Sequence, residues 1–202
     1  MTFEDLLPEL LPEVKGAPAF LAINHLRKAA RDFCERTHIW MADVTPFNTV
    51  VDQTEYTLAL PAQSSVVRLF RANVGDEKGV ALYDEVSADA EVDAGSQSTF
   101  VWLAADKLRL NPVPIDARSV ELKVSLRPSL AATSIPDWIA ELHSETLVHG
   151  AKWTLFAMAD VDWSNPTESD RSMARFLDAC STAARQKTKG RATAQRRRAT
   201  LY

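Results

Sequence analysis

The stretch from Ser134 to Thr188 predicts two successive helices joined by a turn that ends at Asn165. Pro136 lies in the first turn of one helix, and Pro166 follows Asn165, which can cap the other. Apolar residues recur mostly at three- and four-residue steps, so each helix has one face to bury. On the first helix these residues are Trp138, Leu142, Leu147, Ala151, Leu155 and Met158; on the second they are Met173, Phe176, Leu177, Cys180 and Ala184.

A third helix is predicted over residues 17–37. Its apolar face comprises Phe20, Ile23, Leu26, Ala30, Phe33, Cys34 and Thr37. Because a two-helix hairpin leaves much of its apolar surface exposed, we expect this helix to pack onto residues 136–188. Gly150-Ala151 offers a place where helices can approach closely. Residues 3–14, which two prolines interrupt, form at most a helical turn or two lying across the rest.

The middle of the chain has the twofold period of β-strands. The predicted strands are Val50–Asp52, Tyr56–Leu60, Val66–Phe70, Phe100–Leu103, Leu108–Leu110 and Val120–Leu126. Short strands without intervening helices indicate an antiparallel sheet, curled or sandwiched, and not βαβ units.

The sequence therefore predicts an α+β fold in which an antiparallel helical bundle is interrupted by an inserted antiparallel β domain. Residues 1–46 form the N-terminal helical part, and residues 47–128 form a β-sandwich or barrel-like domain. Residues 129–188 form the C-terminal helical pair. Residues 189–202, which have no apolar periodicity, form an extended basic arm that we expect to be disordered in an isolated subunit.

Composition excludes several classes of protein. With 202 residues and 46% hydrophobic content, the chain is ordinary globular material. Its longest uncharged runs fall well short of the ~18 apolar residues that a membrane-spanning helix needs. The acidic N-terminus is unlike a secretory signal, so we expect a protein made inside the cell.

Cys34 and Cys180 are both predicted to be buried free thiols, with a disulfide as the alternative.

The formal net charge of −4 hides a strong asymmetry. No acid follows Asp178, and the positive residues after it are Arg185, Lys187, Lys189, Arg191, Arg196, Arg197 and Arg198. Subtracting these seven positive charges from −4 leaves −11 for the rest of the chain. Such a body repels nucleic acid, whereas the arm is attracted to acidic partners or phosphates.

No group of residues carries a recognisable catalytic, cofactor or metal pattern. His143 and His149 are six residues apart, whereas helical zinc pairs use a four-residue step. Asp160 and Asp162 have no neighbouring nucleophile in the sequence, so we interpret them as part of a turn and not as a catalytic carboxylate pair. A hydrolase that uses Asp160, Asp162 and Glu168 ranks last among the alternative functions. With six glycines and no Gly-rich phosphate loop, nucleotide binding is unsupported. We expect no enzyme activity, no cofactor and no metal.

An acidic segment lies between Asp76 and Gly95. Its carboxylates are Asp76, Glu77, Asp84, Glu85, Asp89, Glu91 and Asp93. The spacing of Asp89, Glu91 and Asp93 resembles the first three ligands of a calcium loop, but Ala94 and Phe100 stand where that loop needs its Gly and Glu. The segment is therefore interpreted as a solvated hairpin loop or a surface presented to a partner.

Three interpretations are open for the basic arm. Arg196-Arg197-Arg198 can bind nucleic acid through charge alone, which would make the protein a nucleic-acid-binding accessory. The arm can also be only a solvated tail. In the third interpretation, it becomes ordered on a partner protein, with Leu201 and Tyr202 as apolar anchors.

Short motifs along nearly the whole chain resemble the head-to-tail adaptor proteins of tailed bacteriophages, including the tail tubular proteins. The motifs are Leu6-Leu7-Pro8, Gly16-Ala17-Pro18, the helix through Leu26–Cys34, Trp40, Val50–Pro61, Leu108–Pro114, Leu126–Ser129, Ile135–Trp138, Trp163–Pro166 and the basic C-terminal arm.

This resemblance implies a virion structural protein at the head-to-tail junction, assembled in the host cytoplasm. It implies a homo-oligomeric ring, commonly of twelve subunits, between the portal protein and a tail or nozzle protein. Double-stranded DNA would pass through the lumen during ejection without specific binding. The arm from Lys189 to Tyr202 would dock on the portal, and the acidic loop would face the tail or the lumen.

Overall fold

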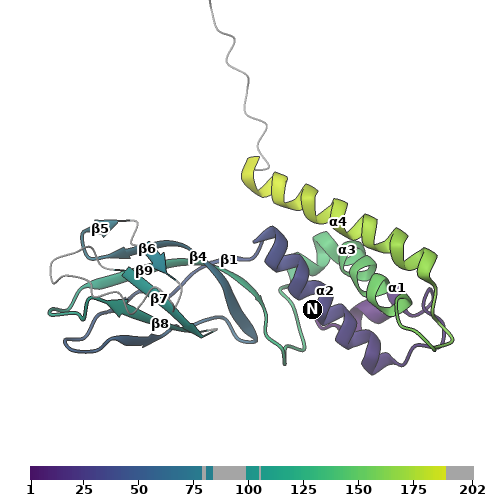
Figure 1. Cartoon of the computed structure of the whole chain (residues 1–202), viewed down its shortest axis with the longest axis horizontal. Coiled ribbons are helices and arrows are strands. Elements are labelled where there is room, and N and C mark those ends of the chain that lie inside the picture. The colour runs from purple at the N-terminus through teal and green to yellow at the C-terminus, as the bar shows by residue number, and fades with distance from the viewer. Residues whose placement is uncertain (79–80, 84–98, 105, 190–202) are drawn as a thin grey trace, which may run out of the picture.

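Helices occupy both ends of the chain and strands occupy its middle, as Figure 1 shows. The computed structural model describes residues 1–78, 81–83, 99–104 and 106–189. The helices are η1 (Glu4–Leu6), α1 (Leu7–Leu10), α2 (Ala19–Thr37), α3 (Asp137–Phe156) and α4 (Pro166–Lys189). The predicted α+β class is confirmed.

The strands form two sheets. Their bounds are β1 (Met41–Asp43), β2 (Phe47–Asn48), β3 (Glu55–Thr57), β4 (Ser64–Val74), β5 (Glu77–Lys78), β6 (Ala81–Tyr83), β7 (Thr99–Ala104), β8 (Lys107–Asn111) and β9 (Ser119–Pro128). One sheet has the order β1-β9-β4-β5, with β2 also paired to β9, and the other has the order β3-β8-β7-β6. The described pairings are antiparallel except that β6 and β7 are parallel, which corrects the expectation of a purely antiparallel β domain.

Strand β9 shows why the alternation of apolar and polar residues in the sequence predicts strands. Val120, Leu122, Val124 and Leu126 are buried, while Glu121 between them is exposed. Side chains of a strand alternate between its faces, so this pattern gives the sheet one apolar face. That face joins the apolar residues of the second sheet and of the helices in one continuous core.

Helices α2, α3 and α4 pack against one another. A Cβ added at Gly150 in α3 would lie 2.8 Å from Ala29 Cβ in α2 and 2.8 Å from Phe176 Cε2 in α4. The helices can therefore come this close because Gly150 has no side chain. The expectation that Gly150 permits a close helix approach is confirmed.

Helix α3 bends at His143, whose backbone angles (φ −137°, ψ 18°) are not helical. Ile139 and Leu147, on either side of the bend, are both buried in the core. Trp138 and Leu142, which the sequence assigned to the buried face, are instead 42% and 50% exposed. The prediction was wrong because Leu147 follows Leu142 by a five-residue step, about 140° around a helix, so Trp138 and Leu142 do not share the face of Leu147.

Other parts of the sequence prediction were also wrong. Residues Val50–Asp52 form a turn, with Asp52 at a φ of 63°, and not a strand. The strand predicted over Tyr56–Leu60 covers only Glu55–Thr57. Phe20, at the beginning of α2, is 68% exposed because the core-facing side of that helix begins at Ala22. Strands β1 and β2 were too short to give a period.

Two further predictions are confirmed. One concerns the packing of the N-terminal residues, and the other concerns the cap at the start of α4. Phe3, Leu6, Leu10 and Val14 are buried, so the first residues lie across the core as expected. The Glu168 N–H donates to Asn165 Oδ1 at 3.2 Å, which is the cap that the sequence predicted.

Candidate interaction surfaces

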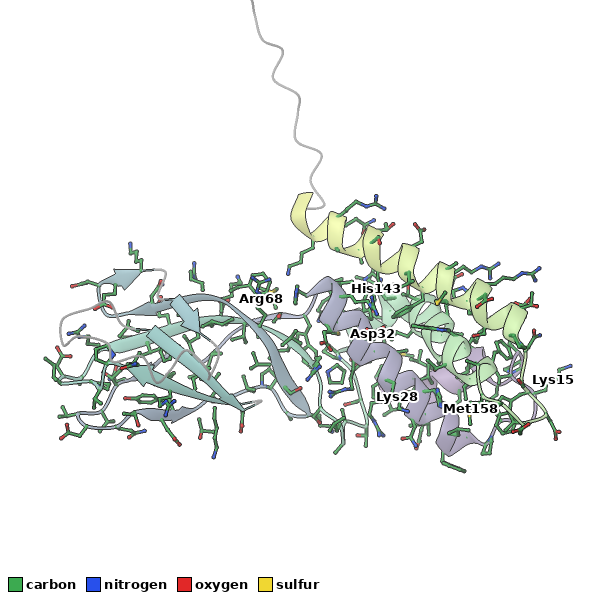
Figure 2. All side chains as sticks on the ribbon, viewed as in Figure 1. Lys15, Lys28, Asp32, Arg68, His143 and Met158 are labelled. Atoms are coloured by element: carbon green, nitrogen blue, oxygen red, sulfur yellow. The ribbon has the colours of Figure 1, made fainter. Side chains whose placement is uncertain are left out.

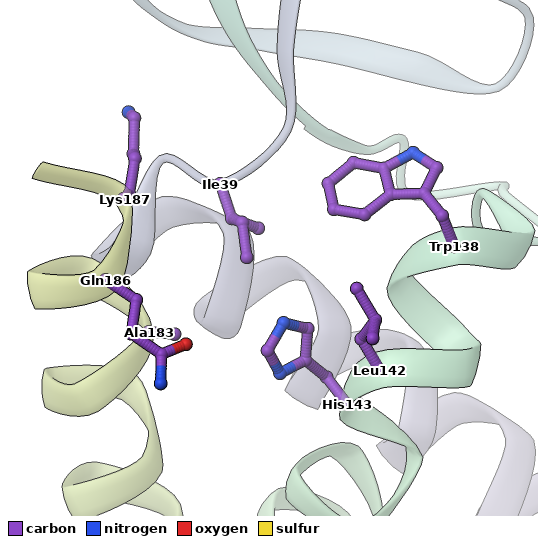
Figure 3. A pocket seen from close by; sticks show the side chains of 7 residues that line it. All are labelled: Ile39, Trp138, Leu142, His143, Ala183, Gln186 and Lys187. Carbon is purple, nitrogen blue, oxygen red and sulfur yellow. The ribbon is translucent and has the colours of Figure 1, made fainter. Parts of the chain in front are cut away.

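An apolar groove lies where the end of α2, the first turns of α3 and the end of α4 meet (Figure 3). It has a volume of about 390 Å³. Its lining residues are Ile39, Trp138, Leu142, His143, Ala183, Gln186 and Lys187. Trp138 and Leu142, which are partly exposed, line it next to the bend of α3 at His143. The His143 ring itself packs on Phe33, with ring centroids 4.8 Å apart.

Lys187 links the last turns of α4 to the strands. Its Nζ donates to the backbone oxygen of His38 at 2.6 Å and lies 4.5 Å from the centroid of the Phe70 ring. Burial, and then nearby Lys123, lower the pKa of the Lys187 ammonium group. Figure 2 shows Arg68 on the side of the strands that faces this end of α4, and its guanidinium lies 5.7 Å from the same ring. The surface beside the groove is therefore cationic.

Exposed aliphatic side chains gather in two adjacent loops at the other end of the strands. Val50, Val51, Val113 and Ile115 are 53%, 53%, 46% and 80% exposed. The loops are held together by the N–H of Asp52, which donates to the Pro114 oxygen at 3.1 Å, and by further hydrogen bonds from Thr49. We refer to residues 50–53 and 113–116 as the apolar tip.

Part of the predicted acidic loop is described. Asp76 is exposed, and Glu77 accepts from Arg118 Nη1 at 3.0 Å. The other predicted residues, Asp84, Glu85, Asp89, Glu91 and Asp93, lie outside the described residues.

Most of the predicted docking arm also lies outside the described residues. Lys189 is the last residue of α4, one residue beyond the predicted end of that helix at Thr188. Arg191, Arg196, Arg197, Arg198, Leu201 and Tyr202 follow it in the sequence and are not described.

In the part of the chain that the structure describes, the candidate histidines and carboxylates do not form one common site. His149 pairs with Glu145 at 3.5 Å, one helical turn away, and Asp160 and Asp162 are exposed in the loop between α3 and α4. Within residues 1–78, 81–83, 99–104 and 106–189, no group of three or more His, Cys, Asp or Glu side chains is placed to hold a metal ion. In the same residues, no helix is long and apolar enough to cross a membrane.

Cys34 and Cys180 are both buried and free, as the sequence predicted. Burial, and then Cys180, raise the pKa of the Cys34 thiol to about 12. Burial and then Asp32 raise the pKa of the Cys180 thiol to about 11. Both groups are therefore poor nucleophiles at neutral pH.

The groove and the apolar tip were missed by sequence reasoning. One signal was present, since the step from Leu142 to Leu147 is five residues and breaks the helical period where α3 bends. The tip had no such signal, because Val50 and Val51 look like strand residues in isolation.

The comparisons with known proteins agree with the resemblance found in the sequence. A family model described as SU10 adaptor protein matches residues 1–201. No curated protein matches the chain. Because the matched region spans nearly all of the sequence, the chain belongs to the SU10 adaptor protein family of phage head-to-tail adaptors.

Proposed function

We propose that this protein forms a ring that joins the portal to the tail of a virion and lets DNA pass through its lumen. The observation that carries this proposal is the match of the adaptor family model to residues 1–201. The charge distribution supports it, since a body of net charge −11 gives a lumen wall that does not retain phosphates.

In the proposed ring, commonly of twelve copies, an antiparallel bundle of α2, α3 and α4 is the scaffold, and the strands form a β domain inserted into it. The close contact of the three helices at Gly150 supports this role, because it makes the helical part a single packed unit. The protein has no catalytic role in this proposal. It acts at the head-to-tail junction after assembly in the host cytoplasm.

The two predicted partner sites stay proposals. Residues 189–202 dock on the portal protein, with Leu201 and Tyr202 as anchors. The acidic loop from Asp76 to Asp93 faces the tail or nozzle protein or the lumen. The arm is basic and the loop is acidic, so the two segments suit different partners. The arm suits an acidic or grooved partner, and the loop suits a basic one.

Binding to the portal tests the proposal. The full chain and a chain ending at Thr188 are mixed with the portal protein encoded by the same phage, and the complexes are measured by native mass spectrometry and electron microscopy. The full chain is expected to give rings on the portal, and the shortened chain is expected to bind much more weakly. No complex of the full chain with the portal would contradict the proposed function.

The basic arm also favours a second candidate, a nucleic-acid-binding accessory protein. Here the same two chains are titrated with DNA in low and high salt. Binding that needs residues 189–202 and weakens steeply with salt would favour this alternative, because phosphate contacts release counterions. The adaptor proposal predicts no such DNA binding at physiological salt.

A further inference from the structure

We propose that the apolar tip of one copy of this chain binds in the groove of the next copy. The inference rests on the proposed function in one respect, that copies of the chain associate. It adds which surfaces meet and which residues make the contact.

The tip has the properties of a preformed ligand. Ile115 is 80% exposed, the largest exposure among the large apolar side chains that the structure describes. The turn beside it is fixed by Tyr56, whose hydroxyl donates to the Gln53 oxygen at 2.7 Å and accepts from the Val50 N–H at 3.3 Å. A rigid loop loses little conformational entropy on binding.

The groove has the properties of a matching receptor. Its volume of about 390 Å³ lies at the lower end of the range of about 300–1,000 Å³ found for ligand clefts. The exposed sides of Trp138 and Leu142 supply the apolar wall. An aromatic residue in a partly enclosed pocket is the usual centre of a protein interface.

Charge favours the tip over the chain's own arm as the occupant. Lys187 is the charged residue among those lining the groove, and the exposed Asp52 follows Val50-Val51 in the tip. Asp116 is already paired with Arg118 Nε at 2.7 Å, so Asp52 carries the charge that matches Lys187. The arm instead carries arginines and no acid. Opposite charges at the rim direct the tip into the groove, whereas like charges oppose entry of the arm.

The contact must join two copies, because the two surfaces lie at opposite ends of strand β9. Ser119 begins this strand beside the tip, where the Gly75 N–H donates to its oxygen, and Pro128 ends it against α2, where Arg31 donates to its oxygen. At about 3.3 Å per residue, a ten-residue strand separates its ends by roughly 30 Å.

A contact between two different surfaces is heterologous. Repetition of such a contact gives a closed ring when the rotation between copies closes, and an open filament when it does not. The proposed contact is therefore of the kind that a ring of identical subunits requires.

Cysteine cross-linking tests the contact directly. Ile115→Cys and Leu142→Cys are made in the full chain, mixed, and treated with a short bismaleimide, both at high concentration alone and with the portal protein present. The native Cys34 and Cys180 are buried with raised pKa values, so the engineered thiols react first. A covalent dimer that links positions 115 and 142, identified by peptide mass spectrometry, is expected only in the mixture.

Leu130→Cys is the matched control, since Leu130 is also apolar and 77% exposed but lies in neither surface. A second pair of variants, Ile115→Asp and Leu130→Asp, is compared by sedimentation. Ile115→Asp is expected to weaken self-association about tenfold or more, the loss that corresponds to one buried aliphatic side chain. Leu130→Asp is expected to leave it unchanged.

The outcomes separate this inference from the proposed function. Oligomers that form without a 115–142 link above the Leu130 control, or that tolerate Ile115→Asp, overturn the inference and leave the adaptor function standing. Cross-linking of position 115 to the portal protein, or of position 142 to the chain's own arm, also overturns it. Absence of any association between copies, alone or on the portal, overturns both.

Discussion

The Nζ atom of Lys187 donates to the backbone oxygen of His38 at 2.6 Å, although the two residues lie at opposite sides of the β-rich segment in the sequence. His38 ends α2 in the left-handed conformation, with a φ of 48°. Its ring packs edge-on against Phe70, which also lies under the Lys187 ammonium group. One contact therefore joins the end of α4, the end of α2 and strand β4.

Replacing Lys187 by methionine is expected to loosen the last turns of α4. The change removes the hydrogen bond to His38 and the cation–π contact with Phe70, each worth about 0.5–1 kcal/mol at a partly exposed site. Amide hydrogen exchange of residues 180–187 should become faster, with the rest of α4 unchanged. The same substitution at the exposed Lys15 is the control and should have no effect. Equal protection in wild type and Lys187→Met would show that the contact does not hold the helix.

Gly150→Ala is expected to destabilise the protein by about 1–2 kcal/mol, even though alanine is the better helix former. The added methyl group would lie 2.8 Å from both Ala29 and Phe176, and one of these neighbours must move. Urea unfolding of Gly150→Ala, Phe176→Leu and the double variant measures the coupling between the two positions. The double variant should cost less than the sum of the single changes. A strictly additive result would mean that the ring of Phe176 is not what the methyl group meets.

Lys152 is buried, with its side chain only 5% exposed, and its ammonium group pairs with Glu13. Glu13→Gln should destabilise the protein by about 1–2 kcal/mol, because it leaves a buried cation without its counter-charge. Lys152→Met should cost less, since it removes the charge and keeps the apolar stem. Thermal unfolding of both variants checks this order. A larger loss for Lys152→Met would contradict it.

Stability is expected to fall as the pH drops below about 6.5. Burial lowers the pKa values of His25, His38 and His149 below their ordinary value of 6.5. The unfolded chain therefore binds protons first, and the stabilisation that is complete above pH 6.5 is lost as the pH falls toward the folded-state pKa values. Urea unfolding at several pH values measures the slope.

His25→Gln provides the control for this pH dependence. His25 Nδ1 lies 2.6 Å from Thr154 Oγ1, and glutamine keeps a polar group near that position without titrating. The slope of stability against pH should become shallower in this variant. An unchanged slope would remove His25 from the explanation.

Much of the fold could be predicted from the sequence where one period extends over a long segment. The core faces of α2 and β9 follow from apolar residues at three- or four-residue steps and at alternate positions. The cap at Asn165 and the close approach at Gly150 follow from the chemistry of single residues. Short segments such as β1 and β2 have too few residues to show a period, and their pairing with β9 depends on distant parts of the chain.

The interaction surfaces were harder to predict than the fold. The groove lies beside the bend at His143, where Trp138 is partly exposed and the next residue, Ile139, is buried. At the bend the His143 ring packs against Phe33 of α2, a contact between two helices that single-residue propensities do not include. The tip depends on two loops brought together by the sheet, so neither loop identifies it alone.

The placement of every described strand between α2 and α3 also affects how the protein is made. Because α2 ends at Thr37 and α3 begins at Asp137, their contact closes a very long loop, which carries an entropic cost and slows folding. A growing polypeptide leaves the ribosome with the apolar side of α2 uncovered until all the strands and α3 have followed. The order of synthesis, more than the helix-forming tendency of any segment, then determines when the helices can assemble, and that interval is when a nascent chain would most need a chaperone.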